Sequence, residues 1–273
     1  MALTGNAIEH VGTALITGAS SGIGAVYADR MAKRGYDLLL VARNRDKLES
    51  LVSELRRRTG RLVRILPADL TQSYDLTCVE EALRQDAAIS VLINCAGFGS
   101  SVPLLEADVT RMEEMIKTNV TALMRLTYAA VPQFVGRKRG TIIQVSSIVA
   151  IAPEILNGVY GGTKAFVLAL TQSMYHELKD TGIRIQAVLP GGTRTDFFSI
   201  AGSPVEQMSE ERRQTLMSPE DLVDAALAGL DQGELITIPP LADKSEWEDF
   251  ERARARMTPH LRNAQPAQRY LAR

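Results

Sequence analysis

Short apolar runs alternate with longer amphipathic stretches along most of the chain. After the capping residue Asn44, for example, Leu48, Leu51, Val52 and Leu55 recur at helical spacing. Strands that alternate with helices typically form a parallel sheet with helices on both faces. The pattern therefore predicts an α/β fold of the doubly wound, Rossmann type, with three layers and about seven strands. The expected strands are residues 13–16, 37–41, 62–66, 91–94, 141–145, 183–189 and 235–238.

No Pro/Gly/Ser-rich linker, repeat or low-complexity tract divides this series. We therefore expect a single domain over residues 1–273, with a core at about 12–240 and a C-terminal helical extension at 241–273. Long helices are expected at about 23–35, 108–134, 159–178 and 219–230.

The extension itself reads as one amphipathic helix. Ser245 and Glu248 form a capping box, and Pro259 ends the helix. One side of it carries apolar side chains, namely Trp247, Phe250, Ala253 and Met257. Packing on its own subunit, a contact between subunits and a cover over the active site all remain compatible with this pattern.

Composition excludes several classes of protein. The chain carries 31 basic and 32 acidic side chains and a net charge of -1, so it has no polybasic surface for nucleic acid. Cys78 and Cys95 form no Cys-x-x-Cys pattern, and the histidines at His10, His176 and His260 are scattered, so no metal site is expected. No apolar run approaches the roughly 20 residues of a membrane span, and no signal peptide is apparent. We expect a cytoplasmic protein that binds neither nucleic acid nor membrane.

A glycine-rich turn follows the first predicted strand and opens the first predicted helix. Its sequence is Thr17-Gly18-Ala19-Ser20-Ser21-Gly22-Ile23-Gly24. Glycines allow a sharp turn and a close approach of the backbone to a pyrophosphate, whose charge then lies at the helix N-terminus. A plain turn is the alternative, but three glycines between a strand and a helix favour dinucleotide binding.

Further elements follow in a fixed order. They are Asn94-Cys95-Ala96-Gly97 after strand four, Asn119, Ser147 after strand five, Tyr160 with Lys164, and Pro190-Gly191-Gly192-Thr193-Arg194-Thr195 after strand six. In this order and spacing, from about residue 12 to 238, the chain resembles the single-domain short-chain dehydrogenases/reductases. The resemblance implies a nicotinamide cofactor held by Gly18, Ser20, Ser21, Gly22, Ile23, Gly24, Asn94, Ala96, Gly97, Tyr160, Lys164, Pro190, Gly191, Thr193 and Thr195. Cys95 departs from the family's usual asparagine, so a backbone brace there is expected to be weaker.

The catalytic residues implied by the resemblance are Asn119, Ser147, Tyr160 and Lys164. The spacing of Tyr160 and Lys164 puts both on one helix face, where the ammonium is expected to lower the pKa of the phenol. Tyr160 then acts as general acid or base, while Ser147 orients the substrate oxygen. The resemblance implies that Asn119 anchors a water molecule, although a buried asparagine bracing a helix is an open alternative.

A second Tyr-x-x-x-Lys match, Tyr175 to Lys179, lacks a serine 13 residues earlier and reads as a surface pair. Gly161 and Gly162 each cost a helix about 1 kcal/mol relative to alanine. Their presence suggests close approach of another backbone or of the nicotinamide, although a buried helix that absorbs the cost explains them equally well.

The end of strand two indicates which nicotinamide cofactor binds. A carboxylate there suits the ribose 2′-hydroxyl of NAD, whereas an arginine suits the 2′-phosphate of NADP. The chain has Ala42 and then Arg43, so NADP(H) is expected over NAD(H). Arg43 and Arg45 as ordinary solvated charges are the alternative. Asp69 and Leu70 resemble the family's adenine contact, and a helix cap at Asp69 is nearly as good an account.

The loops after the strands, at 98–104, 148–158 and 193–217, are expected to hold the substrate. They are rich in apolar residues, namely Phe98, Val149, Ile151, Ile155, Leu156, Phe197, Phe198, Ile200 and Met208. With Ser147 and Tyr160, we expect Phe98, Val149 and Phe197 to contact an apolar carbonyl or alcohol.

The sequence thus predicts an NADP(H)-dependent oxidoreductase that transfers hydride between the nicotinamide and a carbonyl or alcohol carbon. From the resemblance we also expect a homodimer or homotetramer. A regulatory or scaffold protein that senses the cofactor without turnover remains an alternative. A sugar-nucleotide epimerase or dehydratase is less compatible, because only about 35 residues follow the last strand.

Overall fold

The computed structural model describes residues 11–271 and divides the chain into two compact units, Met1–Pro239 and Pro240–Arg273. His10 and the other N-terminal residues on which the absence of a signal peptide was judged lie outside the described residues. Each unit is described by itself below.

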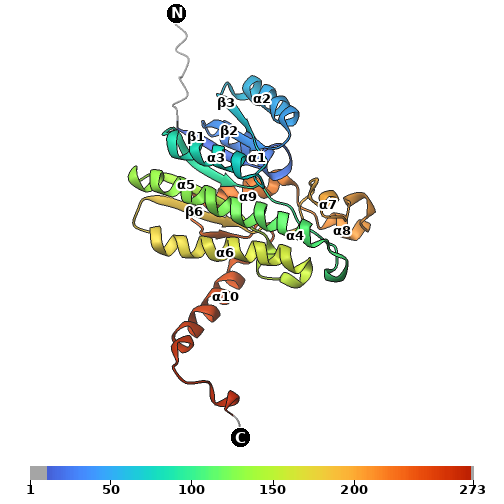
Figure 1. Cartoon of the computed structure of the whole chain (residues 1–273), viewed down its shortest axis with the longest axis vertical. Helices are drawn as coiled ribbons and strands as arrows, with labels where there is room; N and C mark the ends of the chain where they lie inside the picture. Colours follow the sequence, from blue (N-terminus) through green and yellow to red (C-terminus); the bar gives the residue numbers. More distant parts are fainter. Residues whose placement is uncertain (1–10, 272–273) are drawn as a thin grey trace, which may run out of the picture. The chain divides into compact units, whose positions relative to one another are not determined.

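The first unit is built on a sheet of seven parallel strands (Figure 1). Their order is β3-β2-β1-β4-β5-β6-β7, so the direction of winding reverses between β1 and β4. Ligands of such sheets bind at the carboxyl ends of the strands, next to this reversal. The strands are β1 (Thr13–Thr17), β2 (Asp37–Ala42), β3 (Val63–Pro67), β4 (Ile89–Asn94), β5 (Gly140–Val145), β6 (Ile183–Val188) and β7 (Ile236–Thr237).

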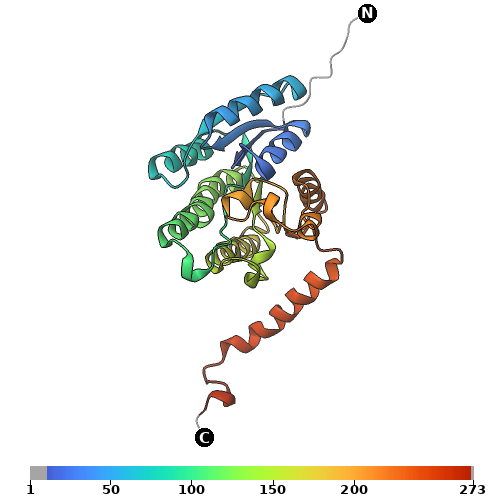
Figure 2. The same cartoon turned by 90° about the vertical axis from the view of Figure 1, so that its right-hand side faces the viewer.

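Helices cover both faces of the sheet. One face carries α1 (Gly22–Lys33), α2 (Arg45–Thr59) and α9 (Pro219–Asp231); the other carries α3 (Ser73–Gln85), α5 (Leu123–Gly136) and α6 (Gly158–Leu178). Alternation along β1 explains the two cores, because Ala14 and Ile16 face the first set and Leu15 the second. Figure 2 shows α3, α5 and α6 together on one side of the strands. The predicted Rossmann-type fold with three layers is confirmed.

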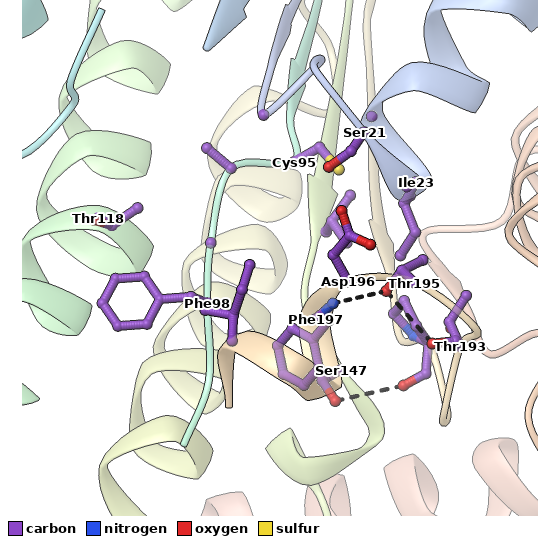
Figure 3. A pocket seen from close by; sticks show the side chains of 18 of the residues that line it. Ser21, Ile23, Cys95, Phe98, Thr118, Ser147, Thr193, Thr195, Asp196 and Phe197 are labelled. Carbon is purple, nitrogen blue, oxygen red and sulfur yellow. Dashed lines mark hydrogen bonds between the residues drawn. The ribbon is translucent and has the colours of Figure 1, made fainter. Parts of the chain in front are cut away.

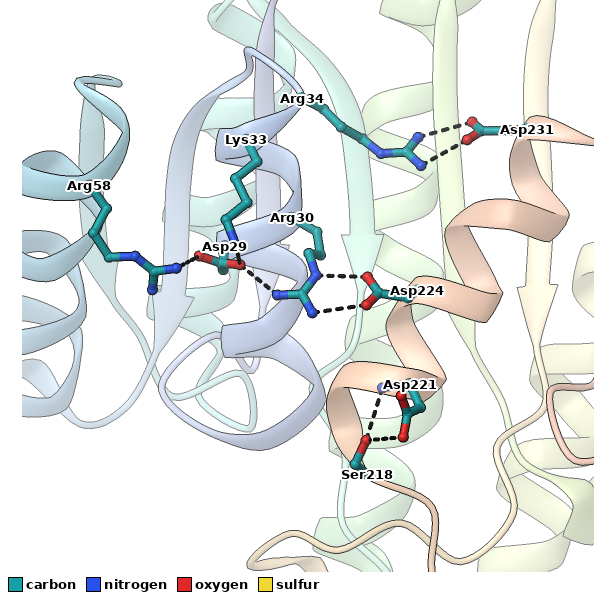
Figure 4. A network of polar contacts seen from close by, with 9 residues as sticks. All are labelled: Asp29, Arg30, Lys33, Arg34, Arg58, Ser218, Asp221, Asp224 and Asp231. Atoms are coloured by element: carbon teal, nitrogen blue, oxygen red, sulfur yellow. Dashed lines mark hydrogen bonds and ion pairs between the residues drawn. The ribbon is translucent and has the colours of Figure 1, made fainter.

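Ion pairs join α1 to α9 across the outer surface (Figure 4). The Arg30 guanidinium donates two hydrogen bonds to the Asp224 carboxylate, at 2.7 and 2.9 Å. The Arg34 guanidinium likewise donates two hydrogen bonds to the Asp231 carboxylate, at 2.9 and 2.8 Å. Such bidentate contacts fix the orientation of the two side chains and add to the strength of the ion pair. The hydrogen bonds from Arg30 are the main reason that the pKa of Asp224 lies below its usual value.

The connection from β4 to β5 is the long helical stretch predicted for 108–134, with one wider turn inside it. It consists of α4 (Val109–Ile116), a π-helical turn η2 (Lys117–Ala122) and α5. Wider turns of this kind are often found at functional sites, and η2 contains Asn119.

The loops after the strands hold further short elements. They are η1 (Leu104–Glu106), η3 (Ile148–Ala150), η4 (Pro153–Ile155), α7 (Phe197–Ile200), η5 (Val205–Gln207) and α8 (Glu210–Gln214). These are the three loops in which the sequence analysis places substrate recognition.

The second unit contains α10 (Lys244–Met257), followed by η6 (Thr258–Arg262) and η7 (Gln268–Tyr270). The predicted capping box at Ser245 is wrong: Asp243 caps the helix, and its carboxylate accepts a hydrogen bond from the Ser245 N–H at 2.8 Å. Trp247 and Phe250 stack with ring centroids 5.3 Å apart. None of the described α10 side chains is buried, and the three roles considered for this helix stay open. Within residues 11–271, no helix is long and apolar enough to span a bilayer.

Candidate active site

A cavity of about 660 Å³ lies at the carboxyl ends of the strands (Figure 3). Its walls come from the turns after β1, β2, β3 and β4, the loops after β5 and β6, and α6. All predicted site residues lie in the described part of the chain, and all but Asn94 and Asn119 line this cavity.

The glycine turn forms one wall of the cavity and fits a pyrophosphate. Gly18 has φ +68°, and a Cβ there would lie 2.8 Å from the Cα of Ala96. A Cβ on Gly24 would lie 2.3 Å from the Gly18 carbonyl oxygen. These two positions therefore accept only glycine, and the bare backbone leaves room at the N-terminus of α1 for a phosphate. The Thr17 hydroxyl accepts hydrogen bonds from the N–H groups of Cys95 and Ala96 at 3.1 and 3.0 Å, so this wall is braced despite Cys95.

Arg43 and Arg45 differ in their surroundings. Arg43 lines the cavity, and within residues 11–271 its side chain makes no hydrogen bond or ion pair. Arg45 pairs instead with Glu49 at 3.3 Å on the exposed face of α2. Of these two arginines, Arg43 is the one whose guanidinium is available to a ligand in the cavity.

Asp69 and Leu70 also line the cavity. The Asp69 carboxylate accepts hydrogen bonds from the Thr71 N–H and hydroxyl at 3.0 and 2.8 Å, which closes a tight turn. The capping position of α3 is occupied by Gln72. The alternative that Asp69 serves as the cap of this helix is therefore wrong.

Ser147, Tyr160 and Lys164 meet in the cavity. Ser147 follows β5 and caps η3, and its hydroxyl accepts a hydrogen bond from the Val149 N–H at 3.3 Å. Tyr160 and Lys164 lie one turn apart on α6, and both are 5% exposed. The Lys164 Nζ donates to the Val145 carbonyl oxygen at 2.8 Å and lies 5.8 Å from the centre of the Tyr160 ring.

The expected direction of the Tyr160 pKa shift is wrong for the protein alone. Burial raises the pKa of the phenol above its usual value, and a hydrogen bond with Ser147 opposes this only in part. Burial also lowers the pKa of Lys164 to about 8. The spacing of two residues on a helix carries no information on burial, and loss of water sets the direction of both pKa shifts. The raised pKa keeps the Tyr160 phenol protonated at neutral pH.

Asn119 acts as a brace beside the site. Its side-chain oxygen accepts from the Phe98 N–H at 3.1 Å, and its amide donates to the Phe98 carbonyl at 2.9 Å and the Thr163 hydroxyl at 3.1 Å. The π-helical turn thus ties the loop after β4 to α6. These contacts match the bracing alternative, and the role of water anchor stays a prediction.

The structure does not bring the Asn94 side chain into the cavity. Asn94 is 2% exposed and donates to Thr127 on α5 at 3.1 Å and to Gln144 on β5 at 3.0 Å. Successive strand residues point to opposite faces of the sheet, and the side chain of Asn94 points toward α5. Its contribution is to hold β4, β5 and α5 together.

The other end of the cavity is largely apolar. Phe197 packs on Tyr160 with ring centroids 5.5 Å apart, and the loops add Phe98, Val149, Ile155, Leu156, Phe198 and Ile200. Two of the apolar loop residues expected to hold the substrate do not line the cavity. Ile151 is exposed, and Met208 is buried against Phe198 and Leu216.

Sequence reasoning missed several wall residues, namely Lys47, Arg111, Glu114, Thr118, Asp196, Arg212, Thr215 and Leu216. Arg111 lies 4.0 Å above the Phe98 ring and pairs with Glu114 at 2.9 Å. The i,i+3 spacing of Arg111 and Glu114 was a readable signal, whereas no local pattern marks the others.

Two predictions on α6 have clear outcomes. Tyr175 and Lys179 are exposed, as expected for a surface pair. A Cβ on Gly161 would lie 3.2 Å from the Pro153 side chain and 3.4 Å from the Pro153 Cα, so η4 packs tightly against this glycine. A Cβ on Gly162 would meet no described atom within 4 Å, so packing does not explain this glycine.

These features define the class of protein. A dinucleotide-type glycine turn, a serine, a tyrosine and a lysine share one cavity at the switch point of a parallel sheet. The family model for short chain dehydrogenases matches residues 12–204, and the chain belongs to that family and is an oxidoreductase. Among residues 11–271 there is no cluster of His, Cys, Asp or Glu that could hold a metal ion.

Three similar proteins illustrate the family. A short-chain dehydrogenase from Sphingobium yanoikuyae, solved in complex with NADPH, is 46% identical, covers 96% of this chain and 100% of its own, and has a TM-score of 0.91. A bulky-bulky ketone specific alcohol dehydrogenase from Comamonas testosteroni is 42% identical over 96% of this chain and 99% of its own, with a TM-score of 0.88. Human 17-beta-hydroxysteroid dehydrogenase type 3 is 32% identical over 67% of this chain and 59% of its own. The complex with NADPH agrees with the predicted cofactor.

Proposed function

We propose that the protein is an NADP(H)-preferring ketone reductase or alcohol dehydrogenase for bulky apolar substrates. The observation that carries this proposal is the convergence of Ser147, Tyr160 and Lys164 in one cavity. That cavity also contains the glycine turn and Arg43, whose side chain has no partner among residues 11–271. When bound, NADP(H) supplies or accepts the hydride.

The residues that would hold the cofactor follow from their chemistry. The N-terminus of α1 and the turn at Gly18 suit the pyrophosphate. Arg43 suits the 2′-phosphate, because its guanidinium matches phosphate oxygens and has no competing partner within residues 11–271. The Lys164 ammonium is fixed by the Val145 carbonyl and suits a ribose hydroxyl.

Tyr160 handles the proton. In the direction of reduction its hydroxyl donates a proton to the carbonyl oxygen, and the raised pKa of the phenol keeps that proton available at neutral pH. The Ser147 hydroxyl lies at the same wall and stabilises the charge that develops on this oxygen. Lys164 then favours the tyrosinate that is left, through its charge below about pH 8.

The substrate class rests on the apolar end of the cavity. Phe98, Val149 and Phe197, with their neighbours, offer rings and branched chains in one cluster with Tyr160. Two named relatives act on a bulky ketone and a hydroxysteroid. Both lines of reasoning favour a ketone with a large apolar group on each side of the carbonyl.

A substrate panel tests this proposal. NADPH oxidation is followed with a diaryl ketone, acetone and a charged keto sugar. Burial of two rings is expected to raise kcat/KM for the diaryl ketone at least about 100-fold over acetone. Turnover only of the charged keto sugar contradicts the substrate class. Cofactor binding without turnover on any ketone favours the cofactor-sensing alternative instead.

Arg43→Gln tests the cofactor preference. Loss of the guanidinium is expected to weaken NADPH binding by about 10-fold and to leave NADH binding unchanged. Arg45→Gln is the matched control, since Arg45 pairs with Glu49. A homodimer or homotetramer and a cytoplasmic location remain predictions, which light scattering and cell fractionation would test.

A further inference from the structure

Two of the three loops predicted to hold the substrate are hydrogen-bonded to each other. The Ala201 carbonyl oxygen, just after α7, accepts a hydrogen bond from the Ser101 N–H at 3.0 Å and another from the Ser101 hydroxyl at 2.8 Å. The hydroxyl groups of Ser101 and Ser203 are also hydrogen-bonded, at 2.8 Å. Gly202 has φ +89°, which allows the sharp turn between Ala201 and Ser203. We call Ser101, Ala201 and Ser203 the serine clasp.

The loop after β4 is anchored to α6. The Asn157 side-chain amide donates to the Val102 carbonyl oxygen at 2.9 Å. The side-chain oxygen of Asn157 caps α6 by accepting a hydrogen bond from the Val159 N–H at 2.9 Å. Asn157 is buried, so both contacts are shielded from water. The serine clasp therefore connects the segment after α7 to the helix that holds Tyr160.

Gly99, in the loop after β4, makes room for the Phe197 ring. A Cβ on Gly99 would lie 2.5 Å from Phe197 Cζ and 3.4 Å from Tyr160 Cδ2. The Phe197 ring therefore fills the space that a side chain at position 99 would take, and it packs on Tyr160 with ring centroids 5.5 Å apart. The place of this ring beside Tyr160 thus depends on the close approach of the two loops.

The helix α7, which begins at Phe197, is too short to fix the ring by itself, because its four residues make only about one helical turn. Hydrogen bonds attach α7 on both sides. The Phe197 N–H donates to the Thr195 hydroxyl at 3.3 Å (Figure 3), and the serine clasp follows the helix. Ser101 and Ser203 are not among the described residues that line the cavity, whereas three of the four α7 residues are. The two serines therefore act on a substrate through α7.

We infer that Gly99, Ser101 and Ser203 are positioning residues, which hold the Phe197 ring on Tyr160 and so shape the substrate space beside the catalytic hydroxyl. This inference rests on the proposed reduction of bulky apolar ketones. A wall that is in place before the substrate arrives costs no ordering on binding, so a ketone whose ring packs on Phe197 binds more tightly. Acetone has only methyl groups and gains little from the same wall.

Steady-state kinetics of NADPH oxidation test the role of the serine clasp. Ser101→Ala removes both hydroxyl contacts and keeps the backbone bond to Ala201. We expect it to raise KM for a diaryl ketone by about 5- to 20-fold and to change kcat by less than about threefold. With acetone, kcat/KM should stay within about twofold. Ser101→Thr keeps the hydroxyl and should restore KM for the diaryl ketone.

Ser199→Ala is the matched control. Ser199 is an exposed serine of α7 itself, and within residues 11–271 its side chain makes no hydrogen bond. Its substitution should leave KM for the diaryl ketone unchanged. Hydrogen exchange at the α7 amides adds a readout that needs no substrate: Ser101→Ala should accelerate the exchange by about 10-fold, and Ser199→Ala should not.

Double variants show whether the effect passes through the Phe197 ring. Gly99→Ala alone should raise KM for the diaryl ketone by about 5- to 20-fold, because its Cβ displaces the ring from Tyr160. In Phe197→Ala the ring is already gone. Adding Gly99→Ala or Ser101→Ala to that variant should therefore change KM by less than about twofold.

Three results overturn the inference. The first is a KM for the diaryl ketone that Ser101→Ala leaves unchanged. The second is an equal loss of kcat/KM with the diaryl ketone and with acetone, which would indicate general damage to the site. The third is an effect of Ser101→Ala that persists in Phe197→Ala. Failure of the proposed substrate class is distinct, because the unchanged protein would then itself turn over acetone as well as the diaryl ketone.

Discussion

Lys164→Met is expected to stabilise the fold while it disables the site. Burial lowers the pKa of Lys164 from 10.5 to about 8. That difference in pKa means that the charged Lys164 ammonium lowers the free energy of unfolding by about 3 kcal/mol at neutral pH. Methionine has a similar length and no charge, but it leaves the Val145 carbonyl without its 2.8 Å partner, which costs about 1–2 kcal/mol. The net expectation at pH 7 is a gain of about 1–2 kcal/mol.

The pH dependence gives this prediction its sign. Between about pH 8 and 10.5 the unfolded chain keeps the Lys164 proton and the folded protein has lost it. Unfolding then takes up a proton, so the stability of the unchanged protein rises by about 1.4 kcal/mol per pH step. The advantage of Lys164→Met should therefore shrink above pH 8 and disappear near about pH 9.

Urea unfolding at pH 7, 8, 9 and 10 measures this difference directly. Lys179→Met is the matched control, because Lys179 is an exposed lysine at the end of the same helix. It should show no such trend. A difference between Lys164→Met and the unchanged protein that is constant from pH 7 to 10 refutes the reasoning, since Lys164 would then keep its charge throughout.

Two other predictions concern stability. Gly162→Ala should raise the free energy of unfolding by about 0.5–1 kcal/mol, because a Cβ there meets no described atom within 4 Å. Gly161→Ala should lower the free energy of unfolding, because its Cβ would press on Pro153. Urea titration of both variants measures the difference, and destabilisation by Gly162→Ala would contradict the account. Asp224→Asn should cost about 0.5–1 kcal/mol at pH 7 by breaking the pair with Arg30. The cost should fade as the pH falls from 3.8 through the lower pKa that Asp224 has in the folded protein, because the carboxylate is protonated there. A cost that does not decline as the pH falls would argue for packing instead.

The periodicity of the chain was enough to predict the sheet and its layers, whereas most of the candidate site residues were implied by the resemblance to the family. Strands with apolar residues on both faces require helices on both sides, and the carboxyl ends of parallel strands bring Gly18, Ser147 and Pro190 to one edge. The face taken by Asn94 also follows from alternation along β4, since Ile93 packs toward α1 and α9. The alternation along β4 was therefore readable in the sequence, but Asn94 was assigned to the cofactor site because of the resemblance to the family.

Other features had no local signal. The i,i+4 spacing of Tyr160 and Lys164 places them on one face but carries no information on desolvation, which sets both pKa values. Lys47 and Asp196 lie far apart in the chain, and their ion pair at 3.7 Å depends on the path of the loop after β6. The π-helical turn around Asn119 likewise depends on the bonds that Asn119 makes to Phe98 and Thr163.

The central claim is that Tyr160 exchanges the proton with the substrate. Its most direct test is the single-turnover rate of NADPH oxidation by Tyr160→Phe with a diaryl ketone at pH 7, alongside the NADPH dissociation constant. Removal of one hydroxyl from a buried ring that packs on Phe197 should leave the fold and the dissociation constant unchanged within about twofold. The rate should fall by about 100- to 10,000-fold. A rate within threefold of the unchanged protein, with NADPH still bound, would contradict the claim.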